Sequence, residues 1–235
     1  MRYFALILGI AVASCTLVAQ QVPPPPPPPT AAPASVTYAV DAANRDPAHF
    51  SLTIDLLGHA VYTARDEDAS SGADDSSQPL YRVEFDVSPA TRDRVFAAAR
   101  ALDYFHGDFD FRKHVVADTG RKTFTYRDGI QQSATTFNWS ENKQLQDAAE
   151  LFESVALTQA LARKLQFLHR YDRLGLNEVL KRMEELAHAN YLSELQSIAP
   201  TLRLIANDAS VMHVARERAN RLLDQVAASG VPPGH

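Results

Sequence analysis

The stretch YRVEFDVSPATRDRVFAAARAL, residues 81–102, predicts a strand that is followed directly by a helix. Its first seven residues alternate apolar and polar side chains, which is typical of a strand with one buried face. Ser88 then offers a side-chain oxygen to cap a helix, and Pro89 suits the first helical position. Apolar residues return at helical spacing from Val95 to Leu102. The stretch therefore predicts a helix that crosses a small sheet.

Alternating segments on both sides of this stretch predict the other strands. Residues 36–40, 50–56 and 59–63 alternate, and Gly58 permits a tight turn between the last two. After the crossing helix, the turn signal Asp128-Gly129 separates two further segments within residues 122–137. These segments predict two hairpins in a small antiparallel sheet.

From residue 140 onward the apolar spacing changes to the 3.6-residue period of a helix. A long helix is expected over residues 140–171 and is stopped by Gly175, and a helix capped at Asn177 follows. Pro200 is expected to kink or split the next helix, and the last one is expected to begin near Asp208 or Ser210. The fold class is therefore α+β: a small antiparallel sheet with one crossing helix, followed by an all-α C-terminal helical bundle, for which HEAT-like hairpins are one arrangement.

The first residues predict export. An apolar run follows Arg2 and is much shorter than the roughly 20 residues that span a bilayer, so we interpret residues 1–19 as a signal peptide. Cleavage after Ala19 would release a free chain into the periplasm or the medium. Cleavage before Cys15, in a sequence that resembles the bacterial lipobox, would leave a lipidated cysteine anchored to the envelope.

Seven consecutive prolines, Pro23–Pro29, lie in a linker that we place at residues 20–35. Such a run favours an extended polyproline II rod, because proline donates no backbone hydrogen bond. The run is interpreted as a semi-rigid, disordered spacer, and the alternative is a ligand for an aromatic-lined groove. We expect the rest of the chain to divide into an α+β module at 36–139, the helical bundle at 140–228 and a disordered tail at 229–235.

Composition excludes several classes of function. The 235-residue chain has a formal net charge of −5, so no basic face is expected for nucleic acid. The single cysteine excludes an internal disulfide framework. A protein is the expected kind of partner, contact with a membrane is expected only through the signal or a lipid anchor, no cofactor is expected, and the oligomeric state stays open.

One loop carries residues that could ligate a metal. His106, Asp108, Asp110, His114 and Asp118 could supply nitrogen and oxygen ligands to a divalent cation that activates water. Their spacing matches no specific motif. Residues 106, 108 and 110 alternate with aromatic residues, so a solvated face over buried rings explains the pattern without a metal, and this interpretation is favoured.

The order of strands and helices carries a resemblance. The run from Thr53 through Gly58 to Tyr62, the helix end at 102–105 and the hairpin at 123–126 resemble small bacterial secreted modules, including emfourin-like inhibitors of metallopeptidases and uncharacterised proteins with export signals. The resemblance covers about residues 36–157. It implies a non-catalytic binding module.

The sequence therefore predicts an exported, non-catalytic interaction protein of unknown partner. A metal-dependent hydrolase that uses the 106–118 loop is one alternative, and a helical scaffold that associates with itself is another.

Overall fold

The computed structural model describes residues 32–43, 45–65, 81–113, 117–129 and 131–229. The predicted signal peptide with Cys15 and Ala19, the proline run and nearly all of the predicted C-terminal tail lie outside these ranges. His114 of the predicted metal loop lies outside them as well. Among the helices in these ranges, none combines the length and apolar character needed to cross a bilayer.

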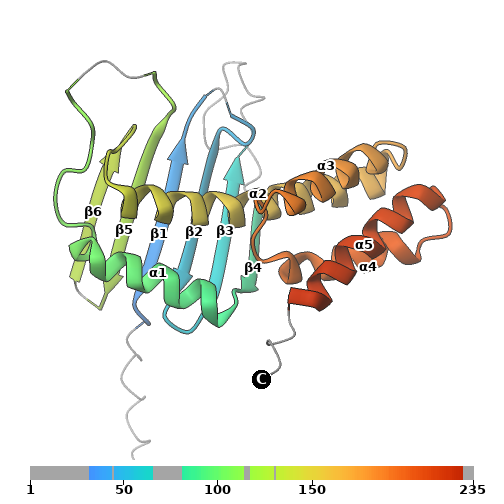
Figure 1. The fold of residues 1–235 in the computed structure, drawn as a ribbon, viewed down its shortest axis with the longest axis horizontal. Coiled ribbons are helices and arrows are strands. Elements are labelled where there is room, and N and C mark those ends of the chain that lie inside the picture. Colours follow the sequence, from blue (N-terminus) through green and yellow to red (C-terminus); the bar gives the residue numbers. More distant parts are fainter. Residues whose placement is uncertain (1–31, 44, 66–80, 114–116, 130, 230–235) are drawn as a thin grey trace, which may run out of the picture. The chain divides into compact units, whose positions relative to one another are not determined.

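The N-terminal part of the described chain is a six-stranded antiparallel sheet (Figure 1). The strands are β1 (Ser35–Asp41), β2 (His49–Asp55), β3 (His59–Arg65), β4 (Tyr81–Asp86), β5 (Arg121–Asp128) and β6 (Gln131–Phe137). They are arranged in the order β4-β3-β2-β1-β5-β6. Both predicted hairpins, β2–β3 and β5–β6, are confirmed by this pairing.

Helix α1 (Pro89–Ala101) and the first half of α2 (Lys143–Tyr171) cover one face of the sheet (Figure 1). Ser88 caps α1 through its side chain, which accepts a hydrogen bond from the backbone N–H of Thr91 at 3.2 Å, so the predicted helix start is confirmed. The covered face is apolar because alternate residues of each strand point to the same side. The opposite face carries hydroxyl groups such as the bonded pair Thr37 and Thr53.

Helix α2 supplies side chains to two hydrophobic clusters. Its first half, through Ala156, packs in the cluster that includes the sheet and α1. Its second half, from Ala162, packs in a cluster with the C-terminal helices. The sequence analysis expected one helix on the sheet and placed a boundary at 139/140; in the structure the helix that follows this boundary lies on the sheet too.

The C-terminal helices are α3 (Leu176–His188), α4 (Ala199–Asn207) and α5 (His213–Ser229), with a short 3₁₀ turn η2 (Leu195–Ile198) before α4. Pro200 lies in the first turn of α4, so it stands at the start of that helix, whereas the sequence predicted that it would kink or split a longer one. A proline fits the first turn because the N–H group that it lacks has no partner inside the helix there. The coarse α+β class is confirmed.

One buried carboxylate joins the C-terminal helices to the sheet-bearing part. Glu194, only 8% exposed, accepts hydrogen bonds from the backbone N–H and the hydroxyl of Ser88, both at 2.7 Å, and from the hydroxyl of Thr91 at 2.5 Å. The side chain of Gln196 donates to the same carboxylate. A negative charge is favourable here because it lies at the N-terminal end of α1, which carries a partial positive charge.

Replacing Glu194 with alanine tests this connection. The change leaves the buried hydroxyl of Thr91 and the partly buried donors of Ser88 without an acceptor, so Glu194→Ala is expected to lower the free energy of unfolding by about 2–4 kcal/mol in urea titrations. Glu185→Ala is the control, because Glu185 is 55% exposed in its side chain and makes only a 3.9 Å ion pair. Equal effects of the two substitutions would contradict the prediction.

Candidate functional site

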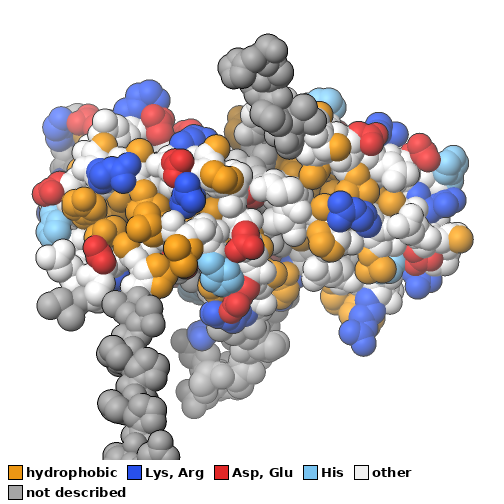
Figure 2. Space-filling model, turned by 90° about the horizontal axis from the view of Figure 1, so that it is seen from below, with side chains coloured by type: hydrophobic (Ala, Val, Ile, Leu, Met, Phe, Trp, Pro, Cys, Tyr) orange, Lys and Arg blue, Asp and Glu red, His pale blue; other side chains and the backbone are white. Residues whose placement is uncertain are grey.

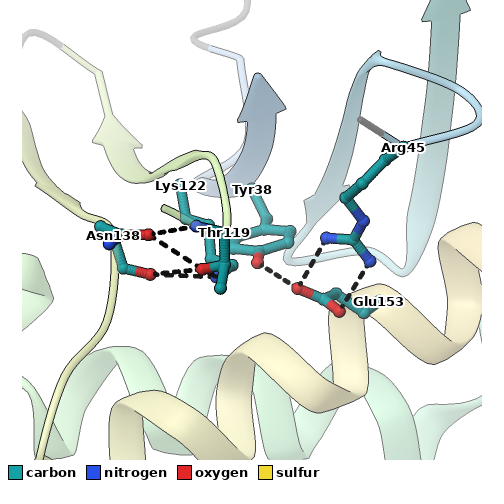
Figure 3. Close-up of polar contacts among 6 residues, drawn as sticks. All are labelled: Tyr38, Arg45, Thr119, Lys122, Asn138 and Glu153. Atoms are coloured by element: carbon teal, nitrogen blue, oxygen red, sulfur yellow. Dashed lines mark hydrogen bonds and ion pairs between the residues drawn. The ribbon is translucent and has the colours of Figure 1, made fainter. Parts of the chain in front are cut away.

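A polar cluster lies where the sheet meets the middle of α2 (Figure 3). The hydroxyl of Tyr38, on β1, donates a 2.8 Å hydrogen bond to Glu153 of α2. The guanidinium of Arg45, from the β1–β2 connection, binds the other oxygen of the same carboxylate at 3.1 Å. Burial and the adjacent Glu153 carboxylate raise the pKa of Tyr38 well above its usual range, so its hydroxyl stays a donor.

Lys122 lies beside this cluster on β5. Its ammonium donates to the hydroxyl of Thr119 at 2.9 Å and to the backbone carbonyl of Asn138 at 3.0 Å (Figure 3). Burial lowers the pKa of Lys122, and the nearby Glu153 carboxylate opposes that shift. Both acceptors are neutral groups, and they belong to two loops at this end of the sheet. Lys122 therefore links these loops through hydrogen bonds.

A groove of about 820 Å³ opens next to Arg45 and Glu153. Helix α2 forms its floor, and residues of α1, of α3 and of the segment after α3 form its walls. Its lining consists of Arg45, Arg94, Asp147, Glu150, Leu151, Glu153, Ser154, Leu157, Arg182, Leu186, Asn190, Tyr191 and Ser193. The volume is in the range of ligand-binding clefts, and its place between two hydrophobic clusters is typical of such clefts.

The lining combines apolar surface with unpaired charges. Tyr191 is 63% exposed and Leu157 is 36% exposed. Within the described ranges, Arg94 and Glu150 form no ion pair with another residue. The two serines of the lining, Ser154 and Ser193, hydrogen-bond each other at 2.7 Å. This arrangement is suited to holding a ligand that has both apolar and charged groups.

The four described residues of the predicted metal loop each contact another group of the protein. His106 contacts the backbone carbonyl of Asp103 at 2.8 Å, and Asp108 pairs with Arg112 at 2.9 Å. The other two carboxylates bind backbone N–H groups at 2.9 Å, Asp110 that of Asn138 and Asp118 that of Gly120. In the ranges that the structure describes, no three His, Cys, Asp or Glu side chains are grouped as metal ligands would be.

The structure brings together one pair that sequence reasoning missed. His169, near the end of α2, lies 2.9 Å from the carboxylate of Asp208, which follows α4. The sequence alone gives no sign of this pair, because the two residues are 39 positions apart and the packing of α4 against α2 brings them together. The hydroxyl of Ser210 binds Asp208 at 2.5 Å, so the carboxylate lies between the serine and the histidine. A serine nucleophile would need to contact the histidine directly.

Comparison with known proteins gives no assignment: no family model matches the chain, and no curated protein matches it.

The contact between His169 and Asp208 predicts how the free energy of unfolding depends on pH. Hydrogen bonds from Ser210 and then His169 lower the pKa of Asp208 to about 2, below the ordinary value of 3.8. The folded state therefore favours the ionised form of Asp208. The resulting contribution to the free energy of unfolding is fully present above about pH 4 and is lost as the pH falls toward 2. The difference in unfolding free energy between the wild type and Asp208→Asn should shrink over that interval in urea titrations. A difference that is independent of pH would contradict this account.

Proposed function

We propose that this protein is an exported, non-catalytic binding protein and that the groove above α2 binds a segment of polypeptide. The observation that carries the proposal is the lining of the groove, in which exposed apolar side chains lie among arginines and carboxylates. A polypeptide offers apolar side chains, carboxylates and cations on one strand. It therefore complements such a lining better than a ligand of a single chemical kind.

Two arginines define the expected chemistry of that polypeptide. Arg94 has no ion-pair partner among the described residues, and Arg182 has only a 3.9 Å contact with Glu185. A guanidinium presents a planar fork of donors that binds a carboxylate through two hydrogen bonds. We therefore expect the bound segment to place an acidic side chain between Arg94 and Arg182, with apolar side chains against Leu186 and Tyr191.

Other features support a binding role over catalysis. The resemblance to emfourin-like modules implies a non-catalytic protein, and the C-terminal helices, proposed as a helical bundle, provide one wall of the groove. Within the chain itself, Asp108 forms an ion pair, and Asp110 and Asp118 accept hydrogen bonds. For this reason the proposal places the ligand site in the groove and not in the 106–118 loop.

Peptides selected for binding can test the groove. Phage-displayed random peptides would be selected on the full chain, and the affinities of synthetic winners would then be measured by calorimetry. Arg94→Glu and Leu186→Asp are each expected to weaken the binding of the winners by about tenfold or more, because each places a repelling or desolvated charge in the groove.

Arg170→Glu is the matched control. Arg170 carries the same charge and lies on the same helix as Glu153, but it stacks on Tyr171 outside the groove. Peptides that bind all three variants with unchanged affinity would contradict the proposed site.

A specific observation also supports self-association as a second candidate function. Phe167, Tyr171 and Leu174, at the end of α2 and after it, are 59%, 66% and 73% exposed, and the rings of Phe167 and Tyr171 lie 5.0 Å apart. Large apolar side chains that gather at one point of a surface are typical of contact sites between proteins. A second copy of this chain could cover them.

Light scattering at several concentrations tests this candidate. The mass of the wild-type protein should rise with concentration, and Phe167→Glu together with Tyr171→Lys should hold it at the monomer value. Leu57→Glu is the control, since Leu57 is 78% exposed in the β2–β3 turn. A wild-type mass that stays at one chain over the whole range would remove the scaffold hypothesis.

A further inference from the structure

A second hollow, of about 510 Å³, opens beside the start of α2. One wall is the segment 108–113 of the loop before β5, and the other is the segment 140–142 between β6 and α2. The backbone N–H of Phe111 donates to the carbonyl of Trp139 at 2.8 Å, which joins the two walls. Asn138, labelled in Figure 3, precedes Trp139 at this end of the sheet. The hollow shares no lining residue with the groove, so it is a separate candidate site.

The apolar surface at this hollow is aromatic. Among the described residues that line it, Phe109 and Phe111 alone are apolar, whereas the groove is lined by three leucines. Trp139 packs edge-to-face against Phe111, with ring centroids 4.8 Å apart and an interplanar angle of 89°. Trp139 is 39% exposed, and within the described ranges its indole N–H has no hydrogen-bond partner. Trp139 therefore offers an exposed ring with an available donor.

The charged side chains of the lining are paired with one another. Lys113 binds Glu141 at 2.8 Å, and Arg112 binds Asp108 at 2.9 Å and Asp110 at 3.6 Å. A metal ion or a charged peptide would have to displace one of these partners. A neutral ligand can add hydrogen bonds to the pairs, because a carboxylate has further lone pairs and a guanidinium has five N–H groups. The pairing that disfavours a charged ligand in this loop therefore suits a neutral one.

Asn142 adds a neutral donor to the lining. Its side-chain oxygen accepts a hydrogen bond from the backbone N–H of Leu145 at 3.1 Å and so caps α2. In the part of the chain that the structure describes, the side-chain NH₂ group of Asn142 has no acceptor. Asn142 and Trp139 thus provide two available N–H donors on either side of the short segment 140–141.

Exposed hydrophobic side chains alone would not identify a site, because such side chains also gather at the other end of the sheet, where β1 begins (Figure 2). The hollow differs because aromatic rings, paired ions and neutral donors meet at one concave surface. Sugars match this combination. Their C–H groups pack on the negative face of an aromatic ring, and their neighbouring hydroxyls both donate to carboxylates and accept from N–H groups.

We propose that the hollow beside Trp139 is a binding site for a neutral glycan. One sugar ring stacks on Trp139, and the hydroxyls of the chain bond to Glu141, Asn142 and the Arg112–Asp108 pair. The site depends neither on the polypeptide proposed for the groove nor on the predicted export, so it can fail or hold by itself. It gives part of the 106–118 loop a binding role that needs no metal.

Tryptophan fluorescence can test the site directly, because Trp139 is the single tryptophan of the chain. The full chain without its predicted signal peptide would be titrated with chitohexaose, cellohexaose and maltohexaose. At least one of them should change the emission in a saturable manner, with a Kd of about 1 mM or lower. Because the ligand is neutral, this Kd should be the same at about 0.05 M and about 0.5 M salt.

Three variants would be compared by calorimetry with the sugar that binds. Trp139→Leu keeps an apolar side chain against Phe111 and removes the ring, so it should weaken binding by about tenfold or more. Trp139→Phe keeps a ring and should bind within about threefold of the wild type. Tyr191→Leu is the matched control, because it removes an aromatic side chain of the groove that is 63% exposed, and it should leave the affinity unchanged. Urea titrations would establish that each variant is folded.

The proposal is overturned if none of the three sugars changes the emission of Trp139, or if Trp139→Leu binds the sugar as tightly as the wild type. An equal loss of affinity in Tyr191→Leu would overturn it as well. So would an emission change caused in Leu186→Asp by the peptides selected for the groove and not by the sugars, since a polypeptide would then occupy the hollow.

Discussion

The length of α2 is the constraint on which the rest of the structure depends. At about 1.5 Å per residue, its 29 residues form one continuous rod of about 43 Å. Leu145 and Phe152 of this rod complete the core against the sheet, while Leu165 belongs to the core of the C-terminal helices. Neither core can be assembled without the same helix. The groove exists because α1 and α3 each pack against a different part of this rod.

Hydrogen bonds and ion pairs lie where the two hydrophobic clusters meet along α2. Glu153 binds Tyr38 and Arg45 from the sheet side, and Glu194 binds the start of α1 from the C-terminal side. Removing a carboxylate from water costs free energy unless hydrogen-bond donors replace the lost water, and this applies in part to Glu153, whose side chain is 30% exposed, and more fully to Glu194. Both carboxylates have such donors. Glu153 and Glu194 therefore determine how the sheet, α1 and the C-terminal helices are oriented. Their net contribution to the free energy of unfolding is the smaller effect.

Much of the fold could be predicted from the sequence, because local signals agree with the final structure. Ser88-Pro89 begins α1, Asp128-Gly129 ends β5, and the 3.6-residue period places α2. The sequence could not reveal that α2 also covers the sheet, since periodicity shows an apolar face without naming what lies against it. Of the candidate sites, the 106–118 loop was visible as a pattern. The groove and the His169–Asp208 pair were not, because they join residues that are far apart in the chain.

The dependence of the sheet on α2 also affects the order in which the chain can fold. During synthesis the six strands are complete once Phe137 has emerged, but their apolar face has no full cover until Phe152 and Val155 follow. The pairing of β1 with β5 adds a long sequence separation, which slows folding further. Part of the apolar face of the sheet is therefore open to other contacts until the first half of α2 has been synthesised.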